Sequence, residues 1–145
     1  MAVKMDAGAL TQFLRREFPQ VAEEFVIERV GEREIDVRLA VAERHLRPGG
    51  TVSGPSMFAL ADVSVYLALL AMIGPEALAV TTGCSMDFMR KPAAGRDMIA
   101  RCRLLKLGRT LAVGDVLLFS EGAEEPVARA SMTYSIPPRQ GRAAG

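Results

Sequence analysis

The feature that most constrains the fold is a nearly uninterrupted apolar segment, Pro55–Ile73, in a chain of 145 residues. Its length approaches the ~20 residues of a membrane-spanning helix. However, Asp62 lies near its middle and no Lys or Arg anchors flank it. We therefore interpret it as a helix buried on nearly all sides inside a protein core, with Ser53 as its cap and Pro55 in its first turn. We expect no association with a membrane.

Strand-like patterns lie on both sides of this helix. An amphipathic pattern from about Asp6 to Phe18 predicts one further helix, which Pro19 ends. Gly31-Glu32 is a plausible turn between the first two strands. The strands are predicted over Phe25–Val30, Ile35–Val41, Ala79–Arg90, Met98–Leu107, Thr110–Phe119 and Val127–Ile136.

The order of these elements predicts how they pack. Antiparallel strands with one apolar face need a covering layer, and the long central helix is the element apolar enough to supply it. We therefore predict an α+β fold in which a single antiparallel sheet wraps around that helix. Residues 1–24 would be an N-terminal helical segment of the same domain, residues 25–136 its main body, and residues 137–145 a flexible tail.

Composition excludes several classes of protein. The chain has 18 Lys and Arg against 17 Asp and Glu, so its formal net charge of +1 argues against binding nucleic acid. With 50% hydrophobic residues, disorder is not expected. The N-terminus does not read as a signal peptide. Cys84 and Cys102 form no metal or disulfide motif, which indicates reduced thiols, a cytoplasmic location and no metal site.

Two features could carry chemistry. Asp62 is the one carboxylate in the apolar helix, and a buried carboxylate must be paired, protonated or placed at a cavity wall. It is either a structural carboxylate or a general base or nucleophile facing a cleft. Gly54 opens the same helix, where free N–H groups can bind an anion or polarise a carbonyl. Because Asp62 follows two turns later, we expect both groups to flank one cleft.

Other catalytic motifs are weak or missing. His45 is the one histidine, and we expect it to be a solvated loop residue rather than part of a triad. No serine lies in a G-x-S-x-G context, and the chain has neither a phosphate-binding loop nor a dinucleotide fingerprint.

Four stretches together resemble one family. HLRPGGTVSGP at 45–55 and FALAD at 58–62 resemble the signature of hot-dog-fold acyl-CoA thioesterases of the phenylacetate-pathway type. DFMRKPA at 87–93 and KLGRTLA at 106–112 extend the match, which covers roughly 25–136.

The resemblance implies a sheet wrapped around a central helix, a homodimer with its sheets joined edge to edge, and often a homotetramer. Active sites in such proteins lie between two protomers. There the residue at Asp62 activates water or attacks the thioester, the N–H at Gly54 polarises its carbonyl, and Thr81 helps to hold the water. Coenzyme A enters as part of the substrate, and no metal or redox cofactor is implied.

The substrate cleft would be lined by residues near these groups, and cations near strand ends could bind phosphates. The further substrate-binding candidates are Arg47, Ser53, Pro55, Met57, Phe58, Tyr66, Thr82, Met89, Arg90, Lys91 and Arg109.

Two departures keep a second hypothesis open. The family usually has Asn where this chain has Arg47, and His-Gly-Gly where it has Ser53-Gly54-Pro55. These changes favour a non-catalytic acyl-CoA-binding module, whereas the presence of Asp62 favours a hydrolase. A dehydratase is the weakest option, because that chemistry pairs a carboxylate with a histidine and His45 lies outside such a motif.

Overall fold

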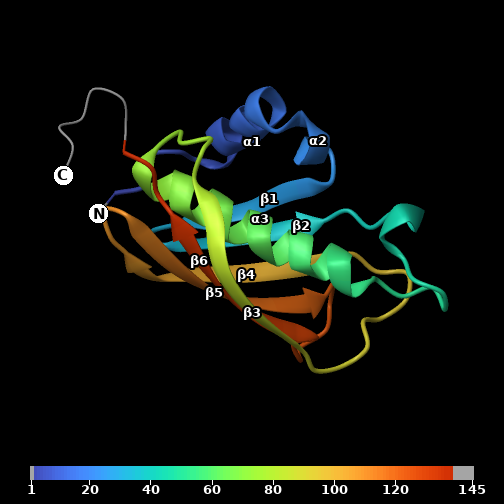
Figure 1. Cartoon of the computed structure of the whole chain (residues 1–145). Coiled ribbons are helices and arrows are strands. Elements are labelled where there is room, and N and C mark those ends of the chain that lie inside the picture. Colours follow the sequence, from blue (N-terminus) through green and yellow to red (C-terminus); the bar gives the residue numbers. More distant parts are fainter. Residues whose placement is uncertain (1, 139–145) are drawn as a thin grey trace.

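The computed structural model describes residues 2–138, and its elements follow the predicted order (Figure 1). Part of the tail predicted for 137–145 therefore lies outside the described residues. The helices are α1 (Ala7–Glu17), α2 (Pro19–Ala22) and α3 (Gly54–Ile73), with a 3₁₀ turn at Glu43–His45. The strands are β1 (Phe25–Gly31), β2 (Glu34–Leu39), β3 (Val80–Phe88), β4 (Met98–Leu107), β5 (Leu111–Ser120) and β6 (Ala128–Ser135).

The six strands form one antiparallel sheet in the order β1-β2-β4-β5-β6-β3. Helix α3 connects β2, near one edge, to β3, at the opposite edge, and so crosses the concave face of the sheet (Figure 1). This is the hot-dog fold, and the predicted α+β architecture is confirmed.

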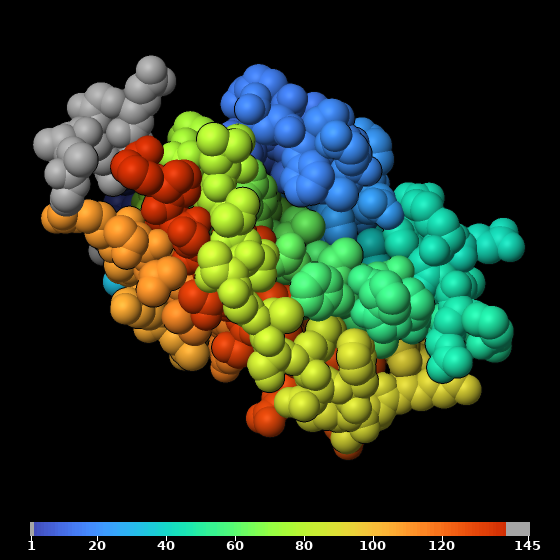
Figure 2. Space-filling view, in the orientation of Figure 1, coloured from blue at the N-terminus to red at the C-terminus, as the bar shows by residue number. Residues whose placement is uncertain are grey.

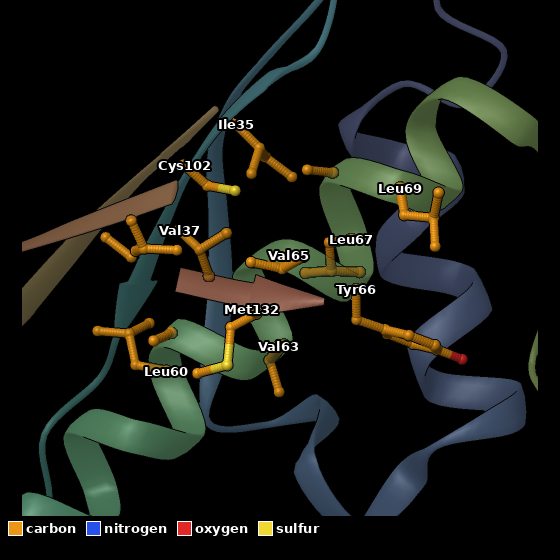
Figure 3. Packing of buried hydrophobic residues seen from close by; sticks show 14 of the residues in the cluster. Ile35, Val37, Leu60, Val63, Val65, Tyr66, Leu67, Leu69, Cys102 and Met132 are labelled. Carbon is orange, nitrogen blue, oxygen red and sulfur yellow. The ribbon is translucent and has the colours of Figure 1, made fainter. Parts of the chain in front are cut away.

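Helix α3 is capped as its sequence predicts and then buried. The Ser53 hydroxyl accepts a hydrogen bond from the Ser56 N–H, and Pro55 occupies the first turn. Within the most apolar stretch of the helix, 72% is buried inside the protein, which confirms the interpretation as a core helix. Figure 3 shows its side chains meeting residues of the sheet, among them Val37 and the free thiol Cys102.

Helix α1 covers a side of α3 that the sheet leaves open. Asp6 caps α1 by accepting from the Ala9 N–H, and the buried face of the helix consists of Leu10, Phe13 and Leu14. The preceding chain is tied to the end of α3, because the Lys4 N–H donates to the Ala71 carbonyl over 2.7 Å. The N-terminal segment therefore forms one wall above the central helix.

Two local predictions are corrected by the backbone. Pro19 does end α1, but it also begins the short helix α2, since proline fits the first helical position. The first hairpin turns at Glu32-Arg33 rather than at Gly31-Glu32, because Arg33 adopts a left-handed conformation with φ of 58° and Gly31 remains in β1.

The prediction that His45 is solvated is wrong, because the residue is only 5% exposed. Its Nδ1 accepts from the Ala42 N–H over 2.8 Å, so the proton lies on Nε2, which is 2.6 Å from Glu24 Oε1. This bond to His45 is the largest cause that lowers the pKa of Glu24. His45 therefore fixes the loop before α3 to the chain before β1.

Gly114 of β5 lies where the sheet closely approaches α3, and a Cβ there would lie 2.9 Å from both γ carbons of Val65. We expect Gly114→Ala to lower the free energy of unfolding by about 1–3 kcal/mol through overpacking. Thermal or urea unfolding measures the loss. In a Val65→Ala background the same substitution should cost much less, whereas an equal cost in both backgrounds would contradict this contact.

Candidate active site

Asp62 lies on the side of α3 that faces β3 and β6, and two hydroxyl groups from these strands hold its carboxylate. The Thr81 hydroxyl donates to Asp62 Oδ1 over 2.5 Å, and the Tyr134 hydroxyl donates to the same oxygen over 2.8 Å. Asp62 Oδ2 makes no hydrogen bond to any described residue. One carboxylate oxygen is therefore fixed, and the other is available to a ligand.

The Asp62 carboxylate opens into a hollow of about 430 Å³, here called the Asp62 hollow. Its walls come from α3, from the chain at 77–81, from β6 and from the α1–α2 junction, where Phe18 and Gln20 lie. The hollow thus combines a polar end at Asp62 with a largely apolar wall, the composition typical of a small-molecule site.

Aromatic rings line one side of this hollow. The Tyr66 ring lies 6.1 Å from Tyr134, 6.4 Å from Phe18 and 6.5 Å from Phe13, measured between centroids. Burial raises the pKa of Tyr66 to about 12, and its hydroxyl donates to the Ala77 carbonyl. Tyr66, a predicted substrate-binding residue, therefore lies in the same hollow as Asp62.

Gly54 lies in a second hollow of about 560 Å³, here called the Gly54 hollow. The ring of Phe88 covers it closely, since a Cβ on Gly54 would be 3.4 Å from the end of that ring. The Gly54 N–H makes no hydrogen bond to the described part of the chain, as expected at the start of a helix. Of the predicted substrate contacts, the structure places Arg47, Met57, Met89, Arg90 and Lys91 in this hollow.

Positive charge gathers at the Gly54 hollow. Arg90 is partly engaged, because its guanidinium pairs with Glu125 at 2.8 Å and donates to the Pro126 carbonyl. Arg47 and Lys91 form no ion pair with residues 2–138. Together with the helix N-terminus, these cations would attract an anionic ligand.

The other predicted contacts lie outside the walls of both hollows. Ser53 serves as the helix cap, and Pro55 and Phe58 are exposed on the first turns of α3. The Thr82 hydroxyl donates to the Thr133 carbonyl at a long 3.4 Å. Arg109 lies in the β4–β5 turn. Within residues 2–138, no cluster of three or more His, Cys, Asp or Glu side chains could hold a metal ion.

Gly54 and Asp62 of one chain do not share a cleft. They lie eight positions apart in α3, which amounts to about 12 Å along the helix axis. A carbonyl bound at the Gly54 N–H would therefore be beyond the reach of the Asp62 carboxylate of the same copy. The expectation that both groups flank one cleft is not met within one chain.

Sequence reasoning missed Tyr134 and the α1–α2 wall. Tyr134 shows as an inward position of β6, in the alternating row with Ala130 and Met132, and a buried tyrosine normally finds a hydrogen-bond partner. Nothing in the local sequence indicates that this partner lies 72 positions earlier, at Asp62.

Comparisons with known proteins define the class. The thioesterase superfamily model matches residues 49–140, which is more than half of the chain. A protein from Pseudomonas aeruginosa named a "putative esterase" is 32% identical over 106 residues, covering 73% of this chain and 78% of the relative. The protein is a thioester hydrolase of the hot-dog fold. The chain belongs to the thioesterase superfamily.

Two solved structures show the same likeness. A crystal structure from Silicibacter sp. TM1040, titled a "putative thioesterase", is 65% identical with a TM-score of 0.89, covering 95% of this chain and 96% of that one. A mutant of the phenylacetic acid degradation protein PaaI from Thermus thermophilus is 31% identical with a TM-score of 0.70. That match covers 82% of this chain and 99% of the Thermus chain.

Proposed function

We propose that this protein hydrolyses acyl-CoA thioesters to the free acid and coenzyme A, with Asp62 as the general base or nucleophile. The observation that carries the proposal is the Asp62 carboxylate itself. Two hydroxyls hold Oδ1, while Oδ2 has no partner among the described residues and the group opens into a hollow. A carboxylate held in this way can accept a proton or attack a carbonyl carbon without first reorganising.

Both possible routes consume one water molecule and give the same two products, the free acid and coenzyme A. As a base, Asp62 removes a proton from water while the water oxygen attacks the thioester carbon; the C–S bond then breaks and the thiolate is protonated. As a nucleophile, Asp62 forms an anhydride with the acyl group, releases the thiol, and water then hydrolyses the anhydride. Thr81 borders the carboxylate and would help to hold the water. Neither route uses a metal or a redox cofactor.

The carbonyl polariser would come from a second copy of the chain. Strand β3 runs antiparallel to α3, with Thr81 beside Asp62 at one end and Phe88 against Gly54 at the other. If two β3 strands pair antiparallel about a two-fold axis near Cys84 and Ser85, the Thr81 end of each strand lies beside the Phe88 end of the other. Asp62 of one copy then lies next to Gly54 of its partner.

The exposure of β3 supports this pairing. In the sheet formed by the described residues it is an edge strand with one side unpaired, and Figure 2 shows it lying along the surface of the molecule. Val80 and Phe88, at its two ends, are each 54% exposed. An exposed edge strand with large apolar residues is a template for strand addition. A homodimer through β3 would cover this edge, and assembly of two dimers into a tetramer remains a prediction for light scattering.

Coenzyme A suits the charge of the Gly54 hollow. The phosphates of this thiol carrier are anionic, and Arg47, Arg90 and Lys91 line the hollow beside the N-terminus of α3. The acyl group would then extend into the aromatic-lined Asp62 hollow of the other copy. The net charge of +1 gives no general attraction for anions, so the attraction is local to this surface.

A panel assay tests the substrate class. Thiol release is measured for aromatic, short-chain and medium-chain acyl-CoAs, and for the same acyl groups on N-acetylcysteamine, which lacks the phosphates. We expect hydrolysis of at least one acyl-CoA, with a much higher KM for its truncated analogue. If acyl-CoAs bind in calorimetry and none releases thiol, the protein is a binding module. Equal KM values with and without the phosphates would refute CoA recognition.

A further inference from the structure

Tyr134 touches the proposed catalytic carboxylate from a strand that sequence reasoning left out of the site. Its side chain is only 3% exposed, and its hydroxyl lies 2.8 Å from Asp62 Oδ1 and 3.1 Å from the main-chain oxygen of Asp62. A single phenol group thus contacts both the side chain and the backbone of the same residue. Such a contact limits rotation of the carboxylate about its side-chain bonds.

The phenol acts as a hydrogen-bond donor in this contact. Burial is the largest cause that raises the pKa of Tyr134, and the nearby Asp62 charge raises it further. The hydroxyl therefore stays protonated and donates a hydrogen bond to Asp62. Thr81 donates to the same oxygen from β3, so two donors converge on Oδ1 and leave Oδ2 without a partner in the described chain.

The ring of Tyr134 is itself held in place. It packs against Tyr66 with the two planes tilted by 36°, and Tyr66 is packed edge-on by Phe18. Tyr134 also alternates inward on β6, whose neighbouring strands are β5 and β3. Since both the strand and the ring are fixed, the hydroxyl is delivered to one position rather than to a range of positions.

We propose that Tyr134 is a positioning residue that fixes Asp62 Oδ1, so that Oδ2 faces the water or the thioester in the Asp62 hollow. This inference rests on the proposed function, because it assigns Tyr134 a role through Asp62. Tyr134 does not exchange protons with the substrate and forms no bond to it.

Tyr134→Phe removes the donor and keeps the ring. We expect kcat to fall about tenfold, because the carboxylate is no longer held at one angle, with KM changed by less than about threefold. A donor to a carboxylate favours its charged form, so the acid limb of the pH–kcat profile should move to higher pH. Tyr134→Met, which is also apolar and lacks a donor, should give the same shift.

Tyr66→Phe is the matched control. It removes a hydroxyl from the same hollow, but that hydroxyl binds the Ala77 carbonyl and not Asp62. Whatever it does to KM, its acid limb should stay at the wild-type pH. A purely structural role for Tyr134 would lower the melting temperature of Tyr134→Phe without moving the acid limb.

Asp62→Asn, assayed alongside, separates the two claims. If Asp62→Asn is inactive and Tyr134→Phe keeps the wild-type kcat and acid limb, the role of Tyr134 is refuted while the proposed function stands. If Asp62→Asn keeps the wild-type kcat, the proposed function fails, and the positioning role fails with it. An inactive Asp62→Asn together with a shifted acid limb in Tyr134→Phe, but not in Tyr66→Phe, supports both.

Discussion

Asp62→Asn is expected to lower kcat for thioester hydrolysis by about 10²–10⁴-fold while the protein stays folded. Asparagine has the same shape, and its carbonyl oxygen can still accept from the Thr81 and Tyr134 hydroxyls that hold Oδ1. Its neutral amide, however, can neither take a proton from water nor attack the thioester carbon. Thiol release at saturating substrate measures the loss, and calorimetry with coenzyme A checks that binding persists.

Asp115→Asn provides the matched control for this charge change. Asp115 is exposed on β5, on the face of the sheet opposite α3, and it lines neither the Asp62 hollow nor the Gly54 hollow. The kcat of the Asp115→Asn variant should equal that of the wild type. If Asp62→Asn retained more than a tenth of the wild-type kcat, Asp62 could not be the base or nucleophile.

Gly54→Pro is expected to lower kcat by about 10²–10³-fold, because it removes the one N–H that we assign to the carbonyl oxygen. Proline suits the first residue of a helix, and the preceding Ser53 is extended, with ψ of 155°. Because Pro55 follows and disfavours a helical backbone at position 54, the fold of the variant is checked first. The measurement is again thiol release, with circular dichroism and light scattering to confirm a folded dimer.

Gly54→Ala keeps this N–H and adds a methyl group, which would meet the Phe88 ring at 3.4 Å, an ordinary contact distance. We expect it to retain most of the activity. If Gly54→Ala and Gly54→Pro lost activity equally, the effect would come from the added carbon atoms, and the role of the amide would be refuted.

The sequence was sufficient to predict the fold because periodicity and end signals agree along the chain. Alternation of polar and apolar residues fixes β2, and Met98–Leu107 was predicted with the bounds that β4 has. The apolar segment identified α3, since a helix apolar on all sides needs a complete cover. These signals are local, so they can be read without knowing which strands pair.

The site was predicted only in part, because its geometry depends on contacts between distant residues. Asp62 stands out because it is charged within an apolar helix. Tyr134 does not, because its contact with Asp62 depends on the register of β6 in the sheet. The sequence did not indicate that His45 is buried, because its partner Glu24 lies 21 positions earlier in the chain, before the first hairpin.

The assumption about Gly54 and Asp62 failed for a geometric reason. Two turns of a helix place residues on related faces, but they also separate them along the axis by about 12 Å. Only the course of β3, from Thr81 at Asp62 to Phe88 at Gly54, shows how a second copy could bring the two groups together.

Mixing two inactive variants tests the shared site most directly. Asp62→Asn and Gly54→Pro, differently tagged, are co-expressed in equal amounts, and size and melting measurements confirm folded assemblies. If Gly54→Pro does not fold, Gly54→Val replaces it, because its γ carbons would crowd the Phe88 ring in the Gly54 hollow. Half of the dimers would then be mixed, each with one intact site, so activity should recover to about a quarter of the wild-type value. If the mixture stays as inactive as either variant alone, Asp62 and Gly54 do not meet across two copies, and the account is contradicted.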